Sequence, residues 1–109
     1  MNQLRNHVQL IGNLGKDVEF KQLKGGNAIA RAVIATKEIY RNPQGEKVVD
    51  VQWHNLVGWG KVAEIMPVLL KKGKQVAVQG KLSHRSFEDK NGHKRYISEV
   101  IVSEFMPMQ

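Results

Sequence analysis

The chain has 109 residues, with 17 Lys or Arg against 10 Asp or Glu and a formal net charge of +7 at pH 7. This length fits one domain over 1–109, and the absence of cysteine excludes disulfides and thiolate metal sites. The N-terminus lacks the apolar run of a signal peptide, and apolar stretches such as 68–70 are too short to cross a bilayer. We therefore expect a soluble, intracellular protein with an anionic partner, nucleic acid before an acidic membrane surface.

Short β-type runs separated by turn residues fill the first half of the chain. A Gly-rich turn is predicted at 24–27, because glycine adopts positive φ at little cost. The polar segment 40–47 contains Pro and Gly and predicts an exposed hairpin loop. The strands predicted in this half cover 7–14, 18–23, 28–37 and 48–59.

One amphipathic helix is predicted after these strands. Apolar residues recur from Val62 to Leu70 at the spacing of a single helix face. The cations and glycine at 71–73 are typical of a helix C-terminus. Pro67 lies inside the pattern and has no N–H to donate, so we expect a short helix that is kinked or broken there.

The last third of the chain again has a β pattern. Alternation over 76–82 predicts a strand, and the runs 83–88 and 94–102 flank an Asn91-Gly92 pair, which is a strong hairpin signal. About five strands, with one short helix between the third and the fourth, predict an all-β fold. The expected architecture is a five-stranded Greek-key barrel of the OB type.

The sequence offers no recognisable catalytic or metal-binding constellation. The histidines lack metal-ligand spacing, and the acidic residues near 17–19 and 88–89 lie beside turns and lysines, as solvated charges do. No phosphate-binding glycine loop is present. We expect no enzymatic activity, no cofactor and no metal.

Three of the aromatic residues are predicted to lie in the barrel core. Phe20, Tyr96 and Phe105 each stand among alternating apolar residues. Such alternation normally directs one set of side chains inward, so burial is the simplest expectation for these rings.

Four other rings have neighbours that leave their faces uncovered. Phe87 lies in a polar hairpin, Tyr40 precedes the polar loop, and Trp59 stands between two glycines. Trp53 is six residues before Trp59, so a regular strand places both on one face. Exposed rings stack on unpaired bases while Lys and Arg contact phosphates, which predicts binding of single strands. The alternatives are two core tryptophans, and Tyr40 and Phe87 rings folded onto aliphatic neighbours.

Several motifs resemble those of the bacterial single-stranded DNA-binding protein family, in the same order from about residue 4 to residue 105. They are VQLIGNLGKD at 8–17, ATKE at 35–38, QWH at 52–54, WGKVAE at 59–64, KGKQV at 72–76, GKL at 80–82 and RY at 95–96. The resemblance implies an OB barrel, usually a homotetramer, that binds single-stranded DNA. It also implies a cytoplasmic, nucleoid-associated role in DNA replication, recombination and repair.

The resemblance also implies roles for individual residues. The stacking aromatics of the family fall on Tyr40, Trp53, Trp59 and Phe87, although relatives often carry Trp at 40 and 87 and Phe at 59. The matching basic residues are Lys37, Lys61, Lys72 and Arg85, with Arg31 and Lys16 as weaker matches. For each lysine, a purely solvated side chain is the alternative. Subunit contacts fall on His54 and on the strand 5–10, which includes Val8. A structural histidine is the alternative for His54.

The resemblance has one departure, and several functions stay open. Family members commonly carry a Gly/Pro/Gln-rich linker and an acidic tip that recruits replication and repair enzymes, whereas 103–109 contain neither. Recruitment through such a tail is therefore doubtful for this chain. The alternatives are an accessory replication-restart or RNA-binding OB protein, a module whose aromatics form a protein interface and, more distantly, an enzyme.

Overall fold

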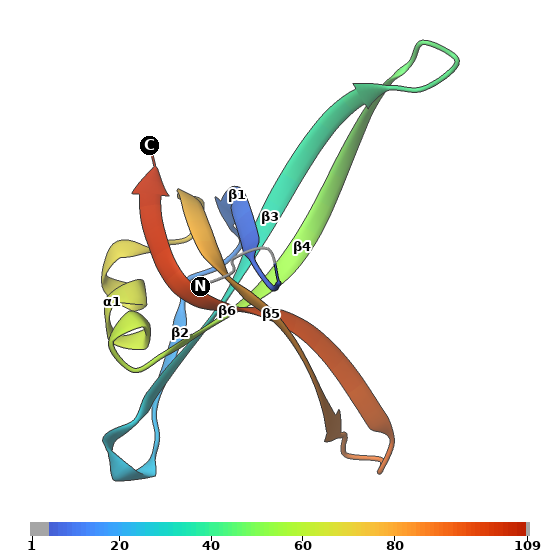
Figure 1. Cartoon of the computed structure of the whole chain (residues 1–109). Coiled ribbons are helices and arrows are strands. Elements are labelled where there is room, and N and C mark those ends of the chain that lie inside the picture. Colours follow the sequence, from blue (N-terminus) through green and yellow to red (C-terminus); the bar gives the residue numbers. More distant parts are fainter. Residues whose placement is uncertain (1–4, 109) are drawn as a thin grey trace.

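The computed structural model describes residues 5–108 as strands around one α-helix (Figure 1). The strands are β1 (Val8–Leu14), β2 (Glu19–Gln22), β3 (Ala28–Arg41), β4 (Lys47–Trp59), β5 (Gln75–Glu88) and β6 (Lys94–Met108). Helix α1 (Lys61–Leu69) connects β4 to β5, and a 3-10 turn, η1 (Lys24–Gly26), connects β2 to β3. Within these residues, no helix combines the length and the apolar character that a membrane span needs.

The long strands close into a barrel. The strand order is β1-β5-β6-β4-β3-β2, and a further pairing of β1 with β3 completes the ring. Neighbours are antiparallel except β4 and β6, which run parallel with Leu56 opposite Val100. Short β2 lies outside the ring and pairs only with β3. The predicted five-stranded barrel is confirmed, with α1 between its third and fourth strands.

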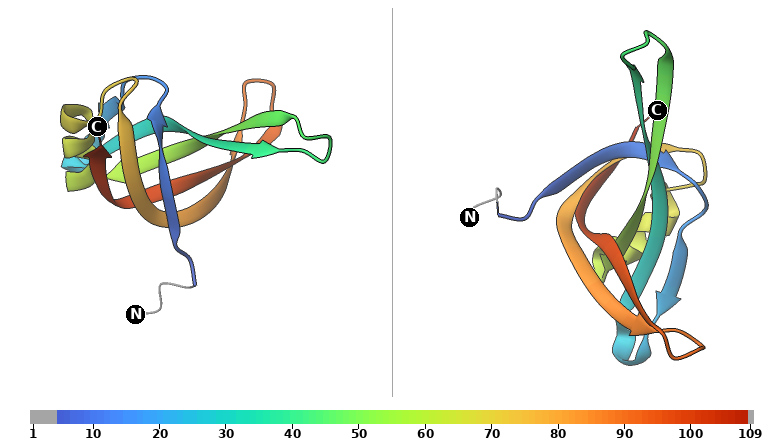
Figure 2. Two further views of the ribbon diagram at one scale, coloured as in Figure 1. Left: turned by 90° about the horizontal axis from the view of Figure 1, so that it is seen from above. Right: turned by 90° about the vertical axis from the view of Figure 1, so that its right-hand side faces the viewer.

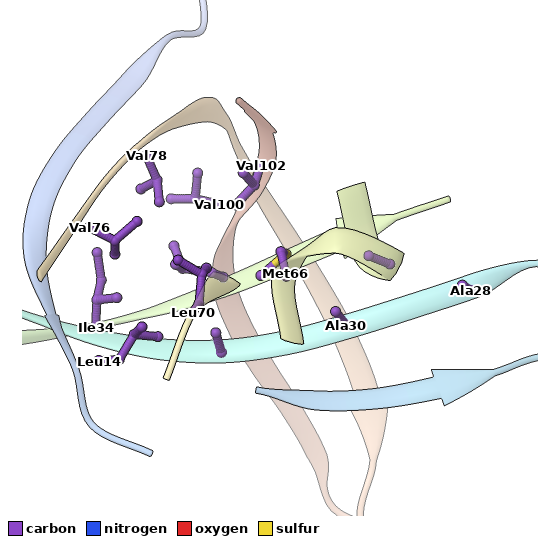
Figure 3. Close-up of a cluster of buried hydrophobic side chains, with 13 residues drawn as sticks. Leu14, Ala28, Ala30, Ile34, Met66, Leu70, Val76, Val78, Val100 and Val102 are labelled. Atoms are coloured by element: carbon purple, nitrogen blue, oxygen red, sulfur yellow. The ribbon is translucent and has the colours of Figure 1, made fainter. Parts of the chain in front are cut away.

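Small and branched side chains fill the barrel interior (Figure 3). Ala30 and Ile34 of β3 are fully buried, and the alanines of this strand let α1 approach closely. Met66 and Leu70 enter the same cluster from the helix side. Burying an aliphatic side chain of this size contributes roughly 1.5–3 kcal/mol, so this cluster is the main source of the barrel's stability.

Two hairpins continue beyond the barrel as arms (Figures 1 and 2). The β3–β4 arm stays paired out to Arg41 opposite Lys47, and the β5–β6 arm stays paired out to Glu88 opposite Lys94. In the view from above, both arms project to the same side of the barrel (Figure 2). They make the molecule elongated, with a longest dimension of 56 Å.

The β3–β4 connection is shorter than the predicted loop at 40–47. Strand pairing includes Arg41 and Lys47, so the turn covers only the residues between them. Its hydrogen bonds run through Asn42, whose Oδ1 accepts the backbone N–H groups of Gln44 and Glu46. Gly45 adopts φ 81°, a conformation that suits glycine. A side-chain-capped turn of this kind allows the strands to continue through a polar sequence.

Two of the three rings predicted in the core are exposed. Phe20 is 44% exposed, because β2 is an edge strand outside the barrel ring. Tyr96 is 74% exposed, because it lies where β6 has left the barrel for the arm. Phe105 is half-buried and packs against the core. The prediction was therefore wrong for Phe20 and Tyr96, since alternation along a strand does not reveal whether anything covers either face.

Helix α1 is not broken at Pro67. It runs from Lys61 to Leu69 and ends two residues after the proline. The Lys71 ammonium donates a hydrogen bond of 2.8 Å to the Pro67 carbonyl, as expected of a cation at the C-terminal end of a helix. Because Pro67 is so close to the helix end, few turns remain for its ring to disturb.

Candidate nucleic-acid interface

One surface of the sheet, here called the outer face, carries the side chains that alternate with the core residues. Register places Trp53 opposite Ala35 and Trp59 opposite Ile29, while Asn55 lies beside Glu99. Paired residues point to the same side of a sheet, so the face continues across neighbouring strands. It comprises 19 and 21 of β2 and alternate residues 29–41 of β3, 47–59 of β4, 81–87 of β5 and 95–101 of β6.

Three of the four predicted stacking rings lie on the outer face and are open to solvent. Trp53 is 61%, Trp59 48% and Phe87 45% exposed. The two tryptophans are six residues apart on β4, a span of roughly 20 Å at about 3.3 Å per residue. Phe87 lies on the β5–β6 arm, in register with Arg95. The rings are therefore not core residues, which settles the alternative that the sequence left open for the tryptophans.

The Trp53 ring lies directly over Gly15. A Cβ atom added at Gly15 would be 2.5 Å from the indole Cζ3. Gly15 is held in turn by its N–H, which donates to the Val33 carbonyl at 2.9 Å. Because Gly15 has no side chain, its backbone packs against one side of the indole and orients the ring. The other side of the indole stays exposed.

Tyr40 is exposed as well, but it lies on the opposite face of the β3–β4 arm. It is 53% exposed and pairs with Val48, one residue out of phase with the outer-face positions. The predicted set of four rings is therefore divided, with three on the outer face and Tyr40 behind it. Sequence spacing alone could not show this, because the result depends on the register that places Ala35, five residues from Tyr40, opposite Trp53.

The predicted cations lie in several different parts of the structure. Lys37 lies on the exposed outer face of the β3–β4 arm, opposite Val51. Lys61 opens α1 two residues after Trp59. Lys72 lies in the connection to β5, where its backbone N–H donates to Asp17 at 2.9 Å. Lys16 is 3.8 Å from Glu19. Arg31 and Arg85 also lie on the outer face, and both contact Glu99.

Further cations on the outer face were not singled out from the sequence. All but Lys21, which pairs with Ile29, lie at even spacing from predicted residues of the same strand, or directly opposite them, and this is the signal that would have found them. They are Lys21, Arg41, Lys47, Lys81 and Arg95. Acidic side chains on the same face are few, namely Glu19 and the buried Glu99. The rings therefore stand on a cationic surface.

A groove of about 410 Å³ lies beside Trp59. Phe20 and Ile29 line it with apolar surface, and Arg31 and Lys21 contribute cations. The exposed Phe20, wrongly expected in the core, thus lies next to a predicted stacking residue. A groove with an aromatic wall and a cationic rim suits an unstacked base and its phosphate.

The two predicted subunit contacts have partners within the chain. The His54 Nε2 is 2.8 Å from the Thr36 hydroxyl, and the ring is half-buried. Val8 pairs with Gly80 of β5 and packs on the edge of the core. Both residues are held in place by the barrel itself, and their contact with a second subunit stays a prediction.

The turn of the β5–β6 arm is organised around Asp89. Its carboxylate accepts a 2.8 Å hydrogen bond from Arg95 Nε and backbone N–H groups of His93 and Asn91. The Arg95 guanidinium and then the His93 N–H lower the pKa of Asp89 below its usual value, against a small opposing effect of burial. The arm that carries Phe87 is therefore closed by a charged network at its tip.

Nothing among residues 5–108 resembles a metal centre, because no group of three or more potential ligands from His, Asp and Glu comes together there. The features that the outer face presents are rings, cations and a groove. Such a surface binds by stacking and charge.

Comparisons with known proteins agree with this geometry. A family-wide sequence model described as "Single-strand binding protein family" matches residues 5–108. The chain is 38% identical over 100 residues to "Single-stranded DNA-binding protein 1" of Chlorobaculum tepidum, a match that covers 91% of this chain and 62% of that protein. The chain thus spans less than two thirds of the length of this relative.

Solved structures show the same fold. The structure of "Plasmodium falciparum SSB complex with ssDNA" is similar with a TM-score of 0.88 at 29% identity, covering 95% of both chains. A deletion mutant of the single-stranded DNA binding protein from Thermus aquaticus is similar with a TM-score of 0.83 at 28% identity. That match covers 95% of this chain and 50% of the other.

Proposed function

The chain belongs to the single-strand binding protein family, and from that premise we propose that it binds single-stranded DNA with little sequence preference. The observation that carries the proposal is the exposure of Trp53, Trp59 and Phe87 on one cationic face. Every base has a π face, so stacking on these rings does not discriminate between sequences. A duplex hides its base faces, so the same surface selects unpaired strands.

Binding combines two kinds of contact. Each stacked base contributes about 1–3 kcal/mol, and the cations of the outer face neutralise phosphates between the rings. Lys61 follows Trp59 by two residues in the chain, and Lys37 lies opposite Val51, two residues from Trp53 on β4. Arg85 stands near Phe87. The bound DNA strand runs along β4 from Trp59 to Trp53 and then reaches the β5–β6 arm at Phe87. Tyr40, on the reverse of the β3–β4 arm, contacts DNA that passes around the arm.

The biological role that follows is protection of single-stranded DNA during replication, recombination and repair in the nucleoid. The protein catalyses no reaction in this role and acts by occupying the strand. It works as a homotetramer, in which the β1 edge near Val8 and the face around His54 form the contacts between subunits. Pairing of β1 with a neighbour would cover an open sheet edge. Sedimentation equilibrium tests the assembly, and a monomer at all concentrations would contradict it.

Quenching of the two tryptophans by poly(dT) tests the proposed function. Phe87→Ala is expected to weaken binding by about 1–3 kcal/mol, the value of one stacked base. Tyr96→Ala is the matched control, since Tyr96 is an exposed ring on the reverse face of the same arm. It should weaken binding much less. Equal affinity of wild type and Phe87→Ala would remove stacking on this arm from the proposal.

The same titration separates DNA from RNA and from a protein partner. Oligo(dT) should compete more strongly than the matched RNA, because the 2′-hydroxyl is the group that differs between them. Binding should also weaken with salt, with a log–log slope of about −0.7 for each phosphate neutralised. A preference for RNA, or affinity that does not depend on salt, would contradict the proposed ligand.

A further inference from the structure

A buried carboxylate lies in the middle of the proposed DNA-binding face. The Glu99 side chain is only 7% exposed, although it lies on the outer face. It stands on β6 between Asn55 of β4 and Ser83 of β5, with which it is in register. Asn55 lies between Trp53 and Trp59 on its strand, two residues from Trp53 and four from Trp59. A DNA strand that runs along β4 from one tryptophan to the other would therefore pass beside Glu99.

The two oxygens of Glu99 differ in how well they are satisfied. Oε1 accepts a hydrogen bond of 2.8 Å from Arg85 Nε. Oε2 is buried and has no hydrogen-bond partner within the described part of the chain, and its cationic neighbour, Arg31 Nη1, is 3.6 Å away. A charge-assisted N–H···O bond is normally about 2.7–2.9 Å long. Arg31 is thus attracted by the carboxylate without being fixed by a hydrogen bond to it.

Arg85 is held more firmly than Arg31. Besides its hydrogen bond to Glu99, its guanidinium carbon lies 5.8 Å from the centre of the Phe87 ring. This distance allows a cation–π contact. The side chains of Arg31 and Arg85 are 44% and 40% exposed, so both can also reach a ligand from solvent. Arg31 can therefore exchange Glu99 for a DNA phosphate with a smaller loss of interaction energy than Arg85.

A small pocket of about 120 Å³ opens at this point. Its polar walls are Lys16, Glu19, Arg31, Asn55 and Glu99. A DNA phosphate that enters here would meet the same guanidinium that Glu99 attracts. The two anions cannot both use Arg31 fully, because charges brought this close in a partly desolvated site repel each other.

We infer that Glu99 is an internal anion that competes with DNA phosphate for Arg31 and thereby limits the affinity and salt dependence of binding. The inference rests on the proposed function. An arginine that is already paired with a carboxylate attracts a phosphate less, so its contact releases fewer of the cations condensed on DNA. Glu99 therefore removes about one charge contact from the interface while Arg85 stays positioned beside Phe87.

The test is the salt dependence of oligo(dT) binding by Glu99→Gln. The amide keeps the size of the side chain and an oxygen that can accept from Arg85, but it no longer attracts Arg31. Binding is expected to be tighter than in wild type, with a log–log slope steeper by about 0.7. The advantage of the variant should therefore be about 2.5-fold larger at about 50 mM than at about 200 mM salt. A wild-type slope, or weaker binding, would overturn the inference.

Two further variants separate this effect from net charge and from simple structural damage. Glu38→Gln changes the net charge of the protein equally, but Glu38 is exposed and lies on the reverse face of the β3–β4 arm, opposite Asp50. The slope of this variant should change much less, because solvent screens a charge that faces away from the bound DNA. In an Arg31→Ala background, Glu99→Gln should lose most of its effect on the slope. Retention of the full effect in that background would show that Glu99 does not act through Arg31.

A comparison that leaves Glu99 intact covers the case in which Glu99→Gln does not fold. Arg31→Ala should flatten the salt slope clearly less than Lys37→Ala, because Glu99 already neutralises much of Arg31. Equal flattening would overturn the inference. If wild-type protein binds no oligo(dT) at all, the proposed function fails. If it binds normally and these slopes do not differ, only the role of Glu99 fails.

Discussion

At the scale of single residues, exposure depends on what covers a side chain more than on its chemistry. Trp53 and Trp59 share a strand and a face with Val57, which is 2% exposed, yet their rings are 61% and 48% exposed. The Trp53 ring packs on the backbone of Gly15. Two exposed indoles on a strand have little structural purpose within one chain, since a free monomer rarely shows large apolar surfaces without a partner.

The contact of Gly15 with the Trp53 ring predicts that a larger residue at position 15 weakens DNA binding. In Gly15→Ala, the added methyl group would overlap the indole, so the ring must tilt away from its present position. We expect affinity for oligo(dT) to fall about three- to tenfold, because part of the roughly 1–3 kcal/mol from one stacked base is lost. The emission of Trp53, measured in a Trp59→Phe background, should change as well. Unchanged emission together with unchanged affinity would show that Gly15 does not position the ring.

At the scale of elements, the two arms are stabilised by their turns. The β3–β4 turn uses the Asn42 side chain, and the β5–β6 turn uses Asp89 with Arg95. An arm outside the barrel has no core of its own, so these polar contacts and strand pairing must keep it extended. Phe87 and Tyr40 are therefore carried by elements whose order depends on the chemistry of their turns.

The Asp89 network predicts a dependence on pH. The pKa of Asp89 in the folded chain lies below its ordinary value of 3.8. Its ionised form therefore stabilises the arm fully above that value, and the stabilisation is lost as pH falls through the lowered pKa. Asp89→Asn keeps an oxygen for the backbone N–H groups but loses the charge that pairs with Arg95.

Thermal unfolding at a series of pH values checks this prediction. Asp89→Asn should be slightly less stable than wild type near neutral pH, and the difference should close below about pH 3.8 as Asp89 takes up its proton. The effect should be small, because the pair lies at an exposed turn. A constant difference across the whole range would show that the charge of Asp89 contributes nothing.

At the scale of the whole molecule, a compact barrel carries two protruding arms on one side (Figure 2). The barrel holds the core, whereas the outer face and the arms hold the cations and rings of the proposed site. This separation lets the binding surface be hydrophobic and charged without disturbing the packed interior. A flexible strand of DNA could then lie between the two arms.

Hydrogen exchange with and without oligo(dT) tests this division. Amides of the arms, 37–50 and 85–95, should exchange more slowly in the complex, because bound DNA limits opening of the hairpins. Amides of α1 should change little, since most of the helix lies on the far side of the barrel from the arms (Figure 2). Protection confined to α1, with none in the arms, would place the DNA on a different surface.

Much of this architecture could be predicted from local patterns. Alternating residues in 76–82, the Asn91-Gly92 turn and the apolar face of 62–70 each correspond to an observed element. These signals are local, because strand and helix periods and turn conformations depend on a few neighbouring residues. The length of the β3–β4 arm was underestimated, since Asn42 stabilises a turn in a polar segment that resembles a longer loop. The ends of the β5–β6 arm at 88 and 94 were predicted correctly.

The sequence by itself determined the class of fold and the kind of surface: alternating strands, a cationic excess and rings with polar or glycine neighbours. Only the tertiary structure decided which sides of those strands are covered. It exposed Phe20 and Tyr96, put Tyr40 behind the arm and brought Glu99 between Arg31 and Arg85. The physical reason is that periodicity assigns a residue to one of two faces, whereas burial and charge pairing depend on where distant strands meet when the barrel closes.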